Sequence, residues 1–206
     1  DPGMLYYAPQ GWISDDTDAA ERVRIQYGTS MCYPISSMGS HVSVVPNHQL
    51  NRITSLHTRA NVAYFGTFGY ELDLNKLTDE EIAEVKAQII FMKEYRELIQ
   101  FGNFYRLKSP FDGNETVWMT VSEDKRKALV FWYRERNVVN AEFTRVRLQG
   151  LDPDLIYKNE YNGTENYGDE LMNLGLLTTD VTAGEPTNED LPCTDYESRI
   201  YVLTAE

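Results

Sequence analysis

The sequence predicts an α/β first half followed by an all-β second half. Up to about residue 103, short strand-like segments bounded by Gly or Pro alternate with amphipathic segments at helical spacing. This alternation indicates a parallel sheet or barrel that is present only in part. After Asn103 the apolar residues recur with a period of two and turn residues separate the runs, as in an antiparallel β-sandwich. We therefore expect two domains, residues 1–103 and 104–206.

The first two helices of the α/β half are expected at residues 18–31 and 55–65. Asp18 precedes the first helix and Glu21 follows three residues later, so the pair predicts a capping box. Thr54 is the expected cap of the second helix. Both helices carry apolar residues on one face, which predicts that this face packs against the sheet.

A third and longer helix is expected at residues 78–100. Thr78 and Glu81 form a second capping box, and the apolar residues that follow repeat at heptad-like spacing. Two short strands are expected around residues 41–45 and 68–72, each bounded by Gly or Pro. These would be the parallel strands of the first half.

The second half contains four segments with strand periodicity. They are expected at residues 116–121, 128–133, 141–148 and 198–203. Trp118 and Trp132 fall within alternating strands, so both are expected to be buried. The pair Asp169 and Glu170 is interpreted as a turn, and the Pro- and acid-rich residues 180–195 as an exposed loop.

Composition excludes several classes of partner. Lys and Arg number 19 against 32 Asp and Glu, a net charge of −13, which disfavours nucleic acid and anionic membrane surfaces. No apolar run approaches the roughly 20 residues that cross a bilayer. Cys32 and Cys193 lie far apart, so free thiols and a reducing, cytoplasmic location are expected. Residue 1 is Asp and no signal-peptide pattern follows, so we expect the C-terminal piece of a longer protein.

Three carboxylates precede the first helix, and one of them has no local role. Asp18 is explained as the helix cap, and Asp16 by its place at the positive end of the helix dipole. Asp15 lies three residues after Trp12, a flat ring of the kind that stacks on sugars, at the end of a loop rich in Pro and Gly. Asp15 is therefore a candidate general acid, while Trp12 is either a sugar-facing ring or a structural anchor.

The histidines do not predict a metal site. No two of His41, His48 and His57 are spaced like ligands on one helix face, and no cysteine or acid accompanies them at zinc-site spacing. We expect hydrogen-bonded structural histidines, no metal and no cofactor. Glu71 and Asp73, at the end of the last expected parallel strand, either line a pocket or solvate its rim.

Several motifs in order carry a resemblance to a known family. They are Trp12-Ile-Ser-Asp-Asp-Thr-Asp-Ala19, Ile25-Gln-Tyr-Gly-Thr-Ser30, Met38-Gly-Ser-His-Val-Ser43, Pro46-Asn-His-Gln49, Gly69-Tyr-Glu-Leu-Asp73 and Tyr167-Gly-Asp-Glu-Leu-Met-Asn-Leu-Gly175. The sequence resembles glycoside hydrolase family 36, the bacterial-type α-galactosidases (melibiases). The resemblance spans nearly the whole chain.

The resemblance implies the C-terminal part of a (β/α)8 TIM barrel followed by the C-terminal antiparallel β-sandwich. It also implies retaining hydrolysis of terminal α-galactosides of the melibiose or raffinose type, with the acid/base role on Asp15 and contact of Asp15 and Trp12 with the sugar. The nucleophile would lie upstream, so the chain is expected to be inactive by itself. The full-length protein would be a homo-oligomer, such as a tetramer, for which Tyr6 and Tyr7 are interface candidates.

Two alternatives stay open at this point. Relatives with the same fold act on α-N-acetylgalactosaminides or transfer galactose, and the upstream residues would decide between these activities. A different alternative is a non-catalytic carbohydrate-binding or assembly module with the sandwich as its functional part. We also expect residues 1–103 to be poorly stable by themselves, since part of a barrel has an open strand edge, and the sandwich to fold independently.

Overall fold

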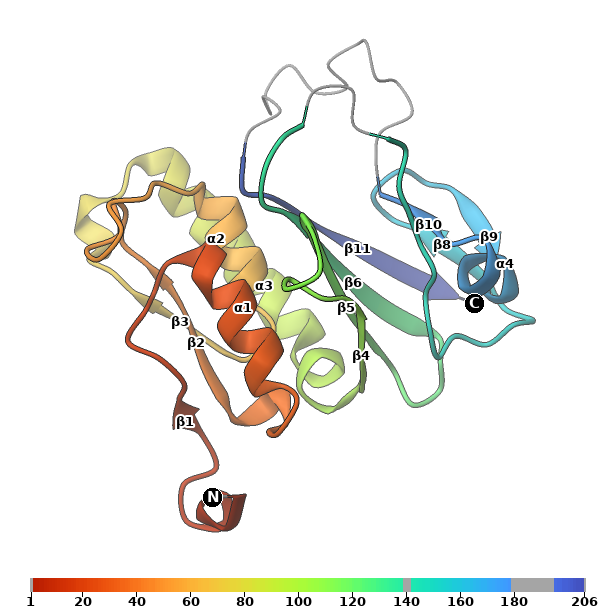
Figure 1. The fold of residues 1–206 in the computed structure, drawn as a ribbon, viewed down its shortest axis with the longest axis horizontal. Coiled ribbons are helices and arrows are strands. Elements are labelled where there is room, and N and C mark those ends of the chain that lie inside the picture. Colours follow the sequence, from red (N-terminus) through yellow and green to blue (C-terminus); the bar gives the residue numbers. More distant parts are fainter. Residues whose placement is uncertain (1, 139–141, 179–194, 206) are drawn as a thin grey trace. The chain divides into compact units, whose positions relative to one another are not determined.

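The computed structural model describes residues 2–138, 142–178 and 195–205. The chain divides into two compact units, Asp1–Phe101 and Gly102–Glu206 (Figure 1). The first unit is α/β and the second is mainly antiparallel β. Cys32 is exposed and free. Cys193 lies outside the described residues, and so does the loop expected at residues 180–195 except for Asp195.

The first unit contains a three-stranded parallel sheet with helices between its strands (Figure 1). The strands are β1 (Gly11–Trp12), β2 (Met38–Ser43) and β3 (Thr67–Glu71), in that order across the sheet. The helices are α1 (Ala19–Thr29), α2 (Leu56–Ala63) and α3 (Asp79–Phe101), with short 3₁₀ turns η1 (Pro2–Tyr6), η2 (Ile35–Ser37) and η3 (Leu74–Lys76). This parallel β-α-β succession is the arrangement expected for part of a (β/α)8 barrel. The strand β1 was not expected from the sequence.

The helix caps agree with the sequence in part. Thr78 and Glu81 form the full box at α3, since each side chain accepts the other residue's backbone N–H, at 3.2 and 2.9 Å. Asp18 caps α1, but Glu21 does not complete the box because the Asp18 N–H already donates to Asp16. The expected cap of α2 was wrong. It is Ser55, not Thr54, whose side chain accepts the N–H at the start of that helix.

The two faces of the parallel sheet differ in character. On one face Ser40 Oγ donates to Gln26 of α1 at 2.8 Å, and Phe68 stacks on Tyr64 at 5.0 Å between ring centroids. This face is therefore packed under the helices. Side chains alternate along a strand, so the residues between these point to the opposite side. We call that side the open face; it carries Trp12, Gly39, His41, Gly69 and Glu71.

The second unit is built on a six-stranded antiparallel sheet, ordered β4-β5-β6-β11-β8-β9, and a two-stranded sheet β7-β10 (Figure 1). The strands are β4 (Asn103–Lys108), β5 (Glu115–Val121), β6 (Lys127–Arg134), β7 (Arg145–Val146), β8 (Ile156–Asn159), β9 (Glu165–Tyr167), β10 (Leu176–Leu177) and β11 (Glu197–Ala205), with helix α4 (Gly168–Asn173). Val146 of β7 and Leu176 of β10 pack against Val130, Trp132 and Tyr201 of the large sheet, which makes the core of a β-sandwich.

Most expectations for this unit are confirmed, with two corrections. The strands expected at 116–121, 128–133 and 198–203 are β5, β6 and β11. A strand was expected at residues 141–148, but its described residues form only the two-residue strand β7. Asp169 and Glu170 were expected in a loop turn, but they lie at the start of helix α4. Trp118 and Trp132 are both 1% exposed, as expected, so neither offers a ring to a ligand in the described structure. Strands β5 and β6 are buried on both faces.

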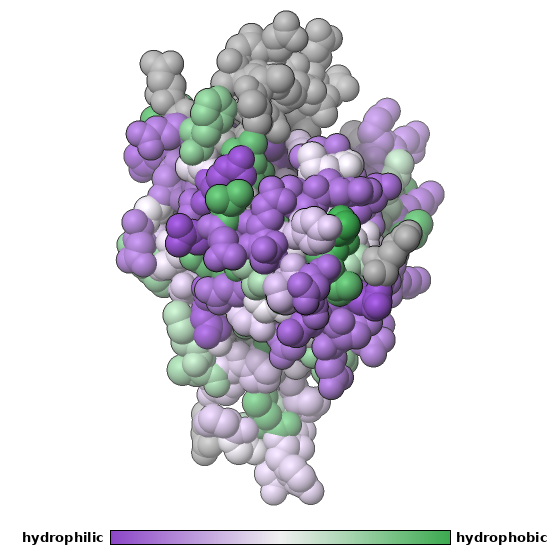
Figure 2. All heavy atoms as spheres, turned by 90° about the vertical axis from the view of Figure 1, so that its right-hand side faces the viewer, coloured by the Kyte–Doolittle hydropathy of each residue, from purple (hydrophilic) through white to green (hydrophobic). Residues whose placement is uncertain are grey.

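One face of the exposed surface is mainly polar. On the face shown in Figure 2, hydrophilic residues predominate and hydrophobic residues lie scattered among them. Within the parts of the chain that the structure describes, no helix is both long enough and apolar enough to cross a bilayer.

Candidate active site

Asp15 follows β1 by three residues, at the carboxyl end of the parallel strands. This is the end of a barrel at which catalytic loops gather. The Asp15 side chain is exposed, and it makes no hydrogen bond or ion pair with any residue that the structure describes. Trp12 is 50% exposed, so it is not a core residue.

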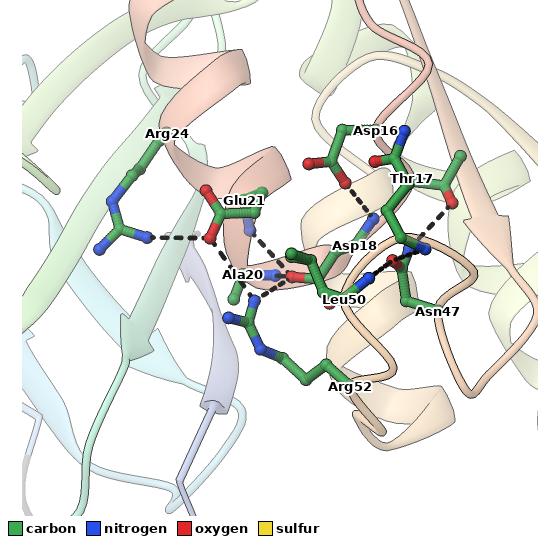
Figure 3. A network of polar contacts seen from close by, with 10 residues as sticks. Asp16, Thr17, Asp18, Ala20, Glu21, Arg24, Asn47, Leu50 and Arg52 are labelled. Carbon is green, nitrogen blue, oxygen red and sulfur yellow. Dashed lines mark hydrogen bonds and ion pairs between the residues drawn. The ribbon is translucent and has the colours of Figure 1, made fainter.

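The carboxylates of Asp16 and Asp18 both accept backbone N–H groups of the loop or of the helix start (Figure 3). Asp16 donates its N–H to Ser14 Oγ and accepts the Asp18 N–H on Oδ1, both at 3.0 Å. The Asp18 carboxylate accepts the N–H groups of Ala20 at 3.0 Å and Glu21 at 3.1 Å. Asp18 is 3% exposed, so its charge is stabilised by hydrogen bonds inside the protein. The loop is thus fixed on both sides of Asp15.

A second segment, residues 47–52 after β2, also contacts this loop through side chains. Arg52 pairs with the buried Asp18 carboxylate and lies 3.6 Å from Glu21 (Figure 3). Asn47 donates from Nδ2 to Thr17 Oγ1 at 3.3 Å, and its own Oδ1 accepts two backbone N–H groups of its turn. These contacts join residues about 30 positions apart, and no local sequence pattern signalled them.

Arg22 of α1 links the loop of Asp15 to strand β2. It is 2% exposed, and its Nη2 donates to the Gly39 carbonyl at 2.9 Å, while Nη1 lies 3.5 Å from the Ser14 carbonyl. Burial lowers the pKa of Arg22 from its ordinary value, and the charges of Asp16 and Glu71 oppose that shift. Because one guanidinium contacts both β2 and the residue before Asp15, it fixes the acid relative to the sheet.

On the open face, the Trp12 indole stacks on the imidazole of His41. The ring centroids are 4.4 Å apart and the planes are inclined by 29°. Burial, followed by the charge of Arg22, lowers the pKa of His41 below 6.5, while Glu71 opposes this. His41 Nδ1 is buried and has no hydrogen-bond partner within the described residues, so the expectation of a hydrogen-bonded histidine fails at that atom. The expectation of a hydrogen-bonded histidine is confirmed for His57, whose Nε2 is hydrogen-bonded to Asn61 Nδ2 at 2.9 Å.

The two acids after β3 have different roles. Asp73 accepts the backbone N–H and side-chain amide of Asn75 at 3.1 and 3.0 Å, which caps η3 and lowers the Asp73 pKa. Its role is therefore local and structural. Glu71 is exposed on the open face, in register with Ser43 of β2. No group of three or more His, Cys, Asp or Glu in the described ranges is arranged to hold a metal ion.

This unit also has a groove of about 430 Å³. It runs between β3 and α3, and Gly69, Met92 and Arg96 are among its lining residues. Neither Asp15 nor Trp12 lines it. Asp15 itself is exposed at the end of the strands.

Comparisons with known proteins agree along nearly the whole chain. The family model described as Melibiase matches residues 1–102, and the model of the glycosyl hydrolase family 36 C-terminal domain matches residues 115–203. The α-galactosidase AgaA of Geobacillus stearothermophilus is 56% identical over 176 residues, and α-galactosidase 1 of Pediococcus pentosaceus is 48% identical. Each match covers 85% of this chain and 24% of the relative.

Solved structures give the same result. A crystal structure of an AgaA variant from Geobacillus stearothermophilus in complex with raffinose has a TM-score of 0.91 at 48% identity, and a variant in complex with stachyose has 0.91 at 50%. Each comparison covers 100% of this chain and 27% of the solved one. This chain thus spans about a quarter of the length of the relatives it matches. The chain belongs to glycoside hydrolase family 36, and it carries the C-terminal part of the catalytic barrel together with the C-terminal β-sandwich.

Proposed function

We propose that this chain supplies the general acid/base of a retaining α-galactosidase, and that Asp15 is that residue. The observation that carries the proposal is the contrast within one loop. Asp16 and Asp18 are both occupied in holding the backbone, whereas the Asp15 carboxylate is exposed and makes no contact with the described residues. A rigid loop with one free carboxylate at the end of barrel strands is suited to proton transfer.

In the proposed reaction, Asp15 acts twice on a terminal α-galactoside. It first protonates the departing glycosidic oxygen while a carboxylate from upstream attacks the anomeric carbon. It then takes a proton from the water that releases galactose with retained configuration. The exposed face of Trp12 would contact the sugar ring. Relatives solved with raffinose and stachyose support raffinose-type galactosides as the substrate class.

The proposal extends to the organisation of the full-length protein. Residues 1–103 would complete a catalytic barrel whose nucleophile lies upstream, and residues 104–206 would form the C-terminal domain. Tyr6 and Tyr7 are 86% and 79% exposed, which supports their place in an interface of a homo-oligomer such as a tetramer. The free thiol of Cys32 is consistent with a reducing, cytoplasmic location.

The test uses the full-length protein with para-nitrophenyl α-galactoside and with raffinose. We expect Asp15→Ala to lower kcat/KM on raffinose by about 10² to 10⁴, and by less on the aryl substrate, whose leaving group needs less protonation. Azide should restore turnover of the aryl substrate and give a galactosyl azide of retained configuration. Asp16→Asn is the control, since it keeps the oxygen that accepts the Asp18 N–H.

An unchanged rate in Asp15→Ala would remove Asp15 from the catalytic role even if the protein is an α-galactosidase. The 206-residue chain assayed by itself should not turn over either substrate, because a retaining mechanism needs its nucleophile. Measurable turnover by the chain alone would contradict that part of the proposal.

A further inference from the structure

The Trp12 and His41 rings meet because of the way β1 pairs with β2. Trp12 lies opposite Gly39 in the parallel register, and His41 is two residues further along β2 on the same face. Both side chains therefore project from the open face, and their rings stack at 4.4 Å. The two residues are 29 positions apart in the sequence, so this contact exists only once the sheet has formed.

Two glycines lie beside the imidazole on this face. A Cβ atom on Gly39 would lie 3.4 Å from Cε1 of His41 and 2.6 Å from Nε2 of Gln10. On Gly69 of β3, which is paired with His41, a Cβ would lie 3.4 Å from Cδ2. The histidine ring is thus flanked by two positions without side chains, and a Cβ atom at either position would be in van der Waals contact with it.

The two rings are unequally exposed, which indicates their roles. His41 is half-buried and its Nδ1 is sealed from solvent, whereas half of the Trp12 surface is open. One face of the indole is covered by the imidazole, so the opposite face is the one available to a ligand. Trp12 also precedes Asp15 by only three residues, within the loop that Arg22 ties to β2 through Ser14.

We infer that His41 is a positioning residue, whose ring holds the Trp12 indole at the angle at which its open face receives the galactose ring beside Asp15. This inference deepens the proposed function and rests on it. His41 does not exchange protons with the substrate; it acts on binding through Trp12. The role requires a flat ring at position 41 and does not require its nitrogen atoms.

The kinetic test compares His41→Ala with His41→Phe in the full-length protein. Losing the stacked partner should raise KM for raffinose about 2- to 10-fold and leave kcat within about twofold, the range expected for one aromatic pair. His41→Phe keeps a flat ring and should restore KM. His57→Ala is the matched control, since His57 is exposed on α2 and bonds only Asn61 among the contacts that the structure gives. A KM unchanged in His41→Ala, or one that Phe does not restore, would overturn the inference.

A second measurement reports the ring contact without activity. The full-length protein is labelled with 5-fluorotryptophan, and the ¹⁹F resonance that disappears in Trp12→Phe is assigned to Trp12. The charged groups that face His41 are Arg22 from α1 and Glu71 from β3, and burial together with Arg22 keeps its pKa below 6.5. The Trp12 resonance should therefore shift with pH, with a midpoint below 6.5, and this shift should vanish in His41→Phe. A resonance insensitive to pH would overturn the contact.

The two readouts separate this inference from the proposed function. A titrating Trp12 resonance in a full-length protein that does not hydrolyse α-galactosides would support the ring contact and overturn the proposed substrate. Normal hydrolysis with an unaltered KM in His41→Ala would support the proposed function and overturn the role of His41. If His41→Ala does not fold, the titration in the wild-type protein and the kinetics of His41→Phe still decide.

Discussion

The contact between Asp18 and Arg52 should determine how firmly the loop of Asp15 is held. Replacing Asp18 by Ala removes the cap of α1, a loss of about 1 kcal/mol. It also removes the ion pair with Arg52. Breaking a buried pair costs about 3–5 kcal/mol, but the Arg52 side chain is 24% exposed and keeps Glu21 within 3.6 Å, so we expect about 1–2 kcal/mol here. The local stability of the loop should fall by about 2–3 kcal/mol in total.

Asp18→Asn is the informative comparison, because it keeps an oxygen for the two helix N–H groups and removes only the charge. Its expected cost is the ion-pair part, about 1–2 kcal/mol. The assay is hydrogen exchange with mass spectrometry on peptides covering residues 14–24 of the full-length protein. Protection should fall about 30- to 150-fold in Asp18→Ala and about 5- to 30-fold in Asp18→Asn. Peptides from α3, which has its own capping box, serve as the internal control.

Two results would refute this reasoning. Equal loss of protection in Asp18→Ala and Asp18→Asn would mean that the cap contributes nothing. Additive effects of Asp18→Asn and Arg52→Met, within about 0.3 kcal/mol in a double-mutant cycle, would mean that the two charges are not coupled. With the loop loosened, Asp18→Ala should also lower kcat, though less than Asp15→Ala does.

Two further predictions concern backbone conformation and pH. Gly150 and Gly163 have φ values of +76° and +72°, but a Cβ would overlap the Tyr105 ring only at Gly150. Gly163→Ala should therefore lower the free energy of unfolding by about 1 kcal/mol, and Gly150→Ala should lower it by clearly more, as measured by thermal unfolding. Equal decreases in the two variants would contradict the predicted overlap. Burial lowers the His41 pKa from 6.5, so below that pH the unfolded chain binds a proton that the folded chain does not. The free energy of unfolding should decline as the pH falls from 6.5 toward the folded pKa, and less in His41→Phe; identical pH profiles would refute this.

The sequence predicts the elements whose signals are local. The box of Thr78 and Glu81 needs only four residues, and both of its bonds are present at α3. The same pattern at Asp18 and Glu21 predicted the N-cap correctly but not the second hydrogen bond of the box. The Asp18 N–H donates to Asp16 instead, and the Glu21 carboxylate lies near Arg52. A capping pattern therefore predicts the helix start, while its side-chain partners depend on tertiary neighbours.

The parts that could not be predicted are either very short or assembled over long separations. The strand β1 has two residues, too few for a period-two pattern, and it forms because β2 offers a parallel partner. In the candidate site, Asp15 and Trp12 were recognisable from their motif. The stack of Trp12 on His41 and the brace by Arg52 were not, because the partners are about 30 positions away in the sequence.

The position of β11 in the large sheet has a consequence for synthesis. Residues 197–205 pair with β6 on one side and β8 on the other, although β6 ends more than 60 residues earlier. A nascent chain emerging from the ribosome would hold β4-β5-β6 and β8-β9 as separate pieces until these residues appear. A premature stop codon before residue 197 would leave β6, a strand apolar on both faces, with an unpaired edge. We expect such a truncated product to be degraded or to aggregate, even though every strand of the sheet except one has been translated.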